Sequence, residues 1–185
     1  YFLNTPSSIE FDKECRRLLT NIHTFDVLRS DRCISCHGLE PRTPFLDRTF
    51  VNYYISLPIN LRNPLTSNIV TQICEKQLLR TSVQNVYPYL LPFNVLWRTK
   101  EAFSDGVSGN TGSWYEIIQQ KLQSSNIEYD VNKKYIHNNP TTAEQQYYRK
   151  IYDKFYYGTE KCIPYFWMPK YVDTDDCSAR TLKIY

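Results

Sequence analysis

The sequence predicts a mainly α-helical fold. Apolar residues recur at helical spacing in several segments, two Ser/Thr-x-x-Glu capping signatures precede such segments, and no set of strands is recognisable. The 185 residues are enough for one domain with a sizeable core. A net charge of +3 without a Lys/Arg run argues against nucleic-acid binding, and no apolar stretch approaches the length of a membrane span.

The N-terminal third predicts helices on both sides of Gly38. From Glu10 to His37 the pattern fits one long helix or two in succession, stopped by Gly38, with apolar positions at Phe11, Cys15, Leu18, Ile22, Phe25, Leu28 and Ile34. Pro44 opens the next helix, Asp47 lies in its first turn, and Pro58 ends it. We expect its buried side to comprise Phe45, Leu46, Phe50, Tyr54 and Leu57.

A third helix is expected from Ile69 to about Val83, with Ile73, Leu78 and Leu79 facing inward. Residues 91–96 lead into a stretch at 97–106 that lacks a helical or strand period and therefore predicts a loop. In it, Lys100 lies between Arg98 and Glu101, with Trp97 and Phe103 available as anchors into a core. A lysine so placed suits an anionic ligand such as a polyphosphate, and a plain surface turn is the alternative.

The C-terminal third predicts two helices and a coil. Residues 113–116 fit a capping box for a helix that ends near Gln123, and residues 141–144 fit a second one. Behind the second box, a stripe that we interpret as core precedes the stop at Gly158: Tyr148, Ile151, Tyr152 and Phe155. Residues 163–171 are rich in prolines and rings and are expected to pack over the helices as an ordered coil.

Six cysteines are present, at positions 15, 33, 36, 74, 162 and 177. The first four fall in segments that read as helices and nothing marks secretion, so reduced thiols in a cytosolic protein are the favoured interpretation. Residues 33–37 match the C-x-x-C-H pattern of haem attachment, but no export signal is present and Met168 is the only methionine. A zinc or redox site is also disfavoured. We therefore expect Cys33 and Cys36 to be small buried side chains.

Four motifs in series resemble the synthetase domain of glutamine-dependent asparagine synthetases. The first, residues 25–47, resembles the family's D-x-L-R-A-D-R segment followed by H-G-L-E-x-R-x-P-F-L-D, and the second, residues 97–106, matches its W-R-x-K-E-A-F-S-D-G block. Residues 77–80 resemble its H-L-L-R. Residues 167–170, with 174–182, resemble its extreme C-terminus. The likeness runs in order, with compatible spacing, over roughly positions 10 to 185.

The resemblance implies that residues 1–185 form the helical C-terminal part of one synthetase domain. That domain is of the α/β adenine-nucleotide α-hydrolase-like (ATP pyrophosphatase) class, and its parallel sheet would lie largely upstream. The implied protein is a cytoplasmic ligase that uses ATP and Mg²⁺ to convert aspartate to β-aspartyl-AMP. Ammonia from glutamine, released in an upstream glutaminase domain of the same polypeptide, then gives asparagine. A homodimer is allowed, and neither nucleic acid nor membrane is expected as a partner.

The resemblance also implies roles for single residues. Lys100 matches the lysine that meets the pyrophosphate of ATP, and Asp26 and Arg29 match positions beside the reacting groups. Four further residues fall where the family lines its ammonia tunnel: Ser30, Glu40, Thr43 and Leu46. The family more often has alanine and valine at positions 30 and 43. Its S-G-G-x-D-S nucleotide loop and its glutaminase cysteine are absent from these 185 residues, as the magnesium ligands are expected to be, so the fragment alone should be inactive.

Two other functions stay open. A related amidotransferase-like ligase, such as a β-lactam-forming synthetase, would act on another carboxylate, although the block at 97–106 favours asparagine synthetase. A non-catalytic helical remnant would bind a partner through its tyrosines, of which the chain has 16. The helical spacing of Asp26, Arg29 and Arg32 does not decide between a solvated face and the rim of a site.

Overall fold

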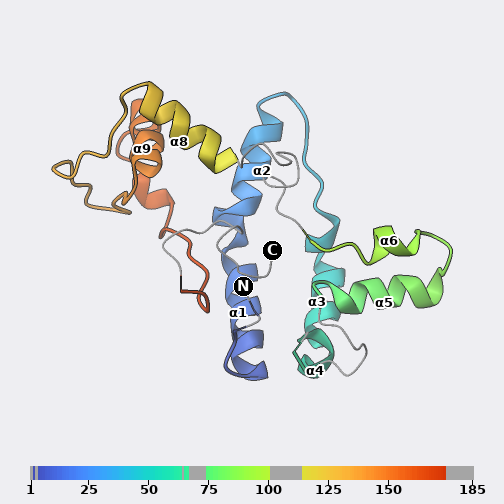
Figure 1. The fold of residues 1–185 in the computed structure, drawn as a ribbon. Coiled ribbons are helices and arrows are strands. Elements are labelled where there is room, and N and C mark those ends of the chain that lie inside the picture. Colours follow the sequence, from blue (N-terminus) through green and yellow to red (C-terminus); the bar gives the residue numbers. More distant parts are fainter. Residues whose placement is uncertain (1, 3, 64, 67–73, 101–113, 174–185) are drawn as a thin grey trace. The chain divides into compact units, whose positions relative to one another are not determined.

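The computed structural model describes residues 2, 4–63, 65–66, 74–100 and 114–173 (Figure 1). Every regular element among these residues is an α-helix or a 3-10 helix, which confirms the mainly α class for this part of the chain. The chain divides into two compact units, Tyr1–Lys100 with Pro169–Asp173, and Glu101–Met168 with Thr174–Tyr185. Within the described ranges, no helix has the length and apolar character needed to span a bilayer.

The first unit begins with two helices in succession, α1 (Ser8–Asn21) and α2 (Asp26–Ser35), joined by the 3-10 turn η1 (Ile22–Thr24). α1 starts before Glu10 because the Ser7 hydroxyl accepts a hydrogen bond from the Glu10 N–H at 3.2 Å. The break falls at Phe25, whose φ of −121° and ψ of −98° are not helical. Gly38, with a left-handed φ of +74°, follows the end of α2 as expected.

The next helix starts later than predicted. Pro44 opens only the 3-10 turn η2 (Pro44–Leu46), and α3 (Arg48–Ser56) begins behind it. Asp47 is the N-cap and not a first-turn residue, since its carboxylate accepts from the N–H groups of Thr49 at 2.9 Å and Phe50 at 3.0 Å. The predicted buried side is wrong for Phe45 and Phe50, which are exposed, whereas Leu46, Tyr54 and Leu57 are half-buried.

A short helix that the sequence did not predict, α4 (Ile59–Arg62), packs against α1. The Arg62 side chain is only 1% exposed and donates from Nη2 to Asp12 Oδ1 at 2.5 Å. Next to it, Asn63 Nδ2 donates to Ser8 Oγ at 3.2 Å. Polar contacts thus join segments 50 and 55 positions apart, beside the buried ring of Phe11.

The third predicted helix is shorter than expected. Residues 69–73 lie outside the described residues, Cys74 is not helical, and Lys76 adopts a left-handed φ of 59° immediately before α5 (Gln77–Val86). The placement of Cys74 in a helix was therefore wrong. So was the inward orientation of Leu79, which is exposed; Leu78 is half-buried. α6 (Phe93–Leu96) is one turn of helix where the sequence predicted only a lead into the loop.

The second unit contains α8 (Trp114–Ser124) and α9 (Ala143–Tyr156), linked by a hydrogen bond from Gln119 Nε2 to Glu144 Oε2 at 2.9 Å. The predicted cap of α8, Ser113, lies outside the described residues. The cap of α9 is Thr142 and not Thr141, since Thr142 Oγ1 accepts from Gln145 N at 3.2 Å. Gln145 Oε1 accepts from the N–H of Thr141, one residue before the cap, at 2.9 Å, so the contacts are a variant of the predicted capping box that begins one residue later.

The apolar stripe of α9 is not core in the described structure. Tyr148, Ile151 and Phe155 are 49%, 40% and 66% exposed, and only Tyr152 is half-buried. The buried residue of α9 is Gln146, at 1% exposed. Its amide exchanges two hydrogen bonds with the backbone of Asp130, at 2.9 and 3.0 Å. Burying an amide costs little free energy when both its N–H and its C=O group are hydrogen-bonded. This explains why Gln146 can occupy the interior.

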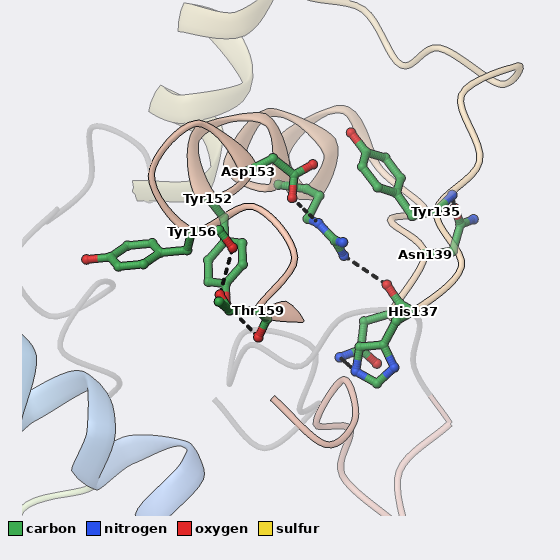
Figure 2. A network of polar contacts seen from close by, with 9 residues as sticks. Tyr135, His137, Asn139, Tyr152, Asp153, Tyr156 and Thr159 are labelled. Atoms are coloured by element: carbon green, nitrogen blue, oxygen red, sulfur yellow. Dashed lines mark hydrogen bonds and ion pairs between the residues drawn. The ribbon is translucent and has the colours of Figure 1, made fainter. Parts of the chain in front are cut away.

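Arg149 of α9 contacts three residues that are labelled in Figure 2, Asp153, His137 and Tyr135. Its Nε donates to Asp153 at 2.9 Å, its Nη1 donates to the His137 carbonyl at 2.8 Å, and its guanidinium lies 4.7 Å from the centre of the Tyr135 ring. His137 Nε2 lies 2.6 Å from the carbonyl of Ile163. α9 therefore contacts the preceding loop at His137, and His137 in turn contacts Ile163 at the start of the tail.

The tail is a coil, as predicted, after the 3-10 turn η4 (Glu160–Cys162). Its last described residues belong to the first unit, where Tyr171 OH donates to Glu10 Oε2 at 3.1 Å and Lys170 Nζ lies 3.6 Å from the same oxygen. The predicted packing of the tail over helices is confirmed for this contact with α1. Hydrogen bonds from Lys13, and next from Tyr171, lower the pKa of the Glu10 carboxyl.

Candidate functional site

Two of the predicted site residues lie at the N-terminal end of α2. Asp26 is its first residue, and Arg29 closes the first turn by donating its N–H to the Phe25 carbonyl at 2.9 Å. Their side chains form an ion pair one turn apart, with 67% of the Asp26 and 76% of the Arg29 side chain exposed. An exposed pair of this kind contributes about 0.3–0.5 kcal/mol. Asp26 and Arg29 therefore lie next to each other, and neither side chain is buried.

The four predicted tunnel residues are spread over α2 and the segment that follows it. Ser30 is half-buried on α2, and Leu46 is half-buried in η2. Thr43 precedes that turn and accepts from the Leu46 N–H at 2.9 Å through its carbonyl. Glu40 is exposed and pairs with Arg42 at 2.8 Å. The hydroxyls at positions 30 and 43 therefore belong to two different elements.

Lys100 is exposed and is the last described residue before 101–113, a range that contains the predicted neighbours Glu101 and Phe103. It belongs to the same compact unit as Asp26 and Arg29. The segment in front of it is well defined: Trp97 N donates to the Phe93 carbonyl at 3.0 Å, and the two rings lie 6.4 Å apart. Trp97 thus contacts α6, but it is only half-buried and Phe93 is 71% exposed, so these contacts do not place Trp97 in a core as predicted.

α5 holds this segment through side chains that sequence reasoning gave no role. Arg80 Nη1 donates to the carbonyls of Leu96 at 2.6 Å and Arg98 at 2.9 Å, and Trp97 Nε1 donates to Gln84 Oε1 at 3.0 Å. Arg80 belongs to the stretch that resembles H-L-L-R, so a signal was present, but neither periodicity nor spacing predicts its backbone partners. In the same helix, Gln77 is buried, and neither polar atom of its side chain has a partner among the described residues.

The C-x-x-C-H pattern at the end of α2 differs from expectation. Cys33 and Cys36 are exposed in the described structure, so their prediction as buried side chains was wrong; the Cys36 thiol donates to the Cys33 carbonyl at 3.4 Å. Half-buried thiols occur elsewhere: partial burial raises the pKa of Cys15 to about 11 and also raises that of Cys74. Among the described residues, no three His, Cys, Asp or Glu side chains gather as metal ligands would.

Comparison with known proteins agrees with these motifs. A family profile described as asparagine synthase matches residues 4–168. The glutamine-hydrolysing asparagine synthetase of Gallus gallus is 45% identical over 188 residues, covering 100% of this chain and 32% of the relative. The human and bovine (Bos taurus) proteins of the same name are 39% and 40% identical, with the same coverage. The chain spans about a third of the length of these relatives. On this evidence, the chain belongs to the asparagine synthase family.

Proposed function

We propose that residues 1–185 are the C-terminal part of the synthetase domain of a glutamine-hydrolysing asparagine synthetase. The full-length protein adenylates aspartate with ATP, giving β-aspartyl-AMP and pyrophosphate, and ammonia from glutamine then displaces AMP to give asparagine. The observation that carries the proposal is alignment along the whole chain, at 39% and 45% identity, with human and chicken proteins of that name. Because these relatives are named asparagine synthetases, they give no support to a β-lactam-forming ligase or to a non-catalytic remnant.

Lys100 is the residue that we assign to the departing pyrophosphate. Negative charge builds on that group during adenylation, and a fixed cation in a water-poor cleft stabilises it selectively in the transition state. An ammonium about 4 Å from one phosphate charge contributes about 4 kcal/mol at an effective dielectric of about 20. This is roughly ten times the strength of an exposed ion pair, which suits a catalytic role.

Arg29 and Asp26 are assigned to substrate binding at the start of α2. The guanidinium of Arg29 presents paired donors that match a carboxylate, so it would orient the aspartate. Asp26 now pairs with Arg29, and in the complex it would hold the incoming amine or Lys100. Since that pair is exposed and weak, exchanging it for substrate contacts costs little.

Ser30, Glu40, Thr43 and Leu46 are assigned to the ammonia tunnel. Hydroxyls at positions 30 and 43 add hydrogen-bonding groups to a wall where the family usually has methyl groups. Restoring them, with Ser30→Ala and Thr43→Val, should raise the ratio of glutamine-dependent to ammonia-dependent synthesis. An unchanged ratio would remove these positions from the tunnel.

The described residues do not fit a magnesium site. Magnesium favours carboxylate oxygens and phosphates in octahedral geometry, and no three acidic, histidine or cysteine side chains converge among the residues that the structure describes. Asp26 also has Arg29 as its partner.

Lys100→Ala in the full-length protein tests the proposed function. Loss of about 4 kcal/mol of transition-state stabilisation lowers the rate of asparagine formation by about 1,000-fold, while glutamine hydrolysis in a separate domain continues. Lys13→Ala is the matched control, because Lys13 is an exposed lysine on α1 whose partner is Glu10. Asparagine formation near the wild-type rate in Lys100→Ala would refute the assignment.

A further inference from the structure

α5 presents two polar side chains to the segment that leads to Lys100. Arg80 and Gln84 are four residues apart and therefore share one face of the helix. Arg80 binds the carbonyls of Leu96 and Arg98, at 2.6 and 2.9 Å, and Gln84 accepts from the Trp97 indole at 3.0 Å. We call these three hydrogen bonds the α5 clasp.

The clasp acts where the backbone leaves a helix. Leu96 is the last residue of α6, so its carbonyl has no partner within that helix. Arg80 satisfies this carbonyl and another two residues later, which fixes the direction of the chain between them. A guanidinium can hold two acceptors in a fixed geometry because its donors are coplanar and rigid, whereas an ammonium cannot impose that geometry.

Much of the same segment is exposed in the part of the chain that the structure describes. Phe93 and Val95 of α6 are 71% and 54% exposed, and Arg98 and Lys100 are exposed as well. Leu96 and Trp97 are only half-buried. Polar contacts with α5 therefore contribute to holding this stretch in place. Their loss would free the backbone without opening a large core.

The position of Lys100 depends on this anchor. Two residues span at most about 7 Å, so the Cα of Lys100 stays within that distance of the clasped residue Arg98. A shift of the Arg98 backbone is passed directly to the lysine. Misplacement of a catalytic group by about 1 Å can lower a rate by about 100-fold.

We propose that Arg80 is a positioning residue for Lys100: through the α5 clasp it sets where the ammonium meets the departing pyrophosphate. The inference rests on the proposed function of Lys100. Arg80 contacts no substrate in this scheme and acts only through the backbone of residues 96–98.

A double-mutant cycle in the full-length protein tests the inference. Arg80→Met should lower kcat for aspartate-dependent pyrophosphate release by about 10–100-fold, with KM for aspartate within about threefold and glutaminase activity unchanged. Arg80→Lys should lower the same kcat by nearly as much. Ser82→Ala, on the same helix with its hydroxyl bonded to the Leu78 carbonyl, is the control and should match wild type. Added to Lys100→Ala, Arg80→Met should lower kcat by less than about threefold further.

Three results would overturn the inference. The first is wild-type kcat in Arg80→Met or Arg80→Lys, and the second is a full multiplicative loss in the double variant. The third is an equal loss of glutaminase activity, which would mean general damage. If Arg80→Met does not fold, Gln84→Met, which removes only the bond to Trp97, takes its place in the cycle. Near-normal synthesis in Lys100→Ala alone would instead refute the role proposed for Lys100, so the two failures are distinguishable.

Discussion

The buried contact between α4 and α1 predicts an asymmetry between its two partners. Arg62 is 1% exposed, and its Nη1 atom has no hydrogen-bond partner among the described residues. Asp12 is 15% exposed and keeps a second partner, Arg16, at 2.8 Å. Asp12→Asn leaves a buried guanidinium facing a neutral amide and should lower the free energy of unfolding by about 3 kcal/mol. Arg62→Met removes that buried charge and its bond to the Leu57 carbonyl at 3.0 Å. It should therefore cost only about 1 kcal/mol.

Urea unfolding of the chain, followed by far-UV circular dichroism, measures both changes. With a slope of about 2 kcal/mol/M, Asp12→Asn lowers the midpoint by about 1.5 M and Arg62→Met by about 0.5 M. The double variant should resemble Arg62→Met, because the amide no longer faces a buried charge. A larger loss in Arg62→Met than in Asp12→Asn would refute the reasoning, since it would show that the arginine contributes more through its contacts than it costs through its burial.

Two further predictions concern a cap and the thiols. Asp47→Ala removes the acceptor for two N–H groups of α3 and should lower the free energy of unfolding by about 1 kcal/mol. Asp47→Ser keeps an acceptor and should retain most of that free energy. Equal losses in the two variants would argue against capping. Alkylation at pH 8 should modify the exposed Cys33 and Cys36 well before Cys15, because burial raises the pKa of Cys15 to about 11 and leaves it a neutral thiol until the pH approaches that value. Mass spectrometry of digests would show the order, and early labelling of Cys15 would contradict it.

Local signals predicted the helices better than their ends or their buried faces. Periodicity found α1, α2, α3 and α9, because an amphipathic stripe is a property of neighbouring residues, and a capping signature found α8. The start of α3 was misplaced because Asp47 competes with Pro44 as the first signal, and the cap of α9 was misplaced because two threonines adjoin. The stripe of Tyr148, Ile151 and Phe155 was identified, but periodicity does not say what covers an apolar face.

The candidate site was predicted as motifs and not as geometry. The resemblance pointed to Lys100, Asp26 and Arg29, and the structure adds the pairing of Asp26 with Arg29 and the clasp in front of Lys100. Arg80 binds carbonyls 16 and 18 positions away, and Arg62 binds a carboxylate 50 positions away. Such partners depend on how the chain turns between elements, and the turns here include a left-handed Lys76 that no glycine or asparagine signals.

The contact of Tyr171 with Glu10 joins parts of the first unit that lie 161 positions apart. That unit is discontinuous, because residues 101–168 are inserted before its last strip, Pro169–Asp173, is added. A ribosome therefore delivers the final strip only after the whole insert has emerged. Until then, residues 1–100 are present without the hydrogen bond from Tyr171 to the Glu10 carboxylate. The order of translation therefore sets when this unit can be completed.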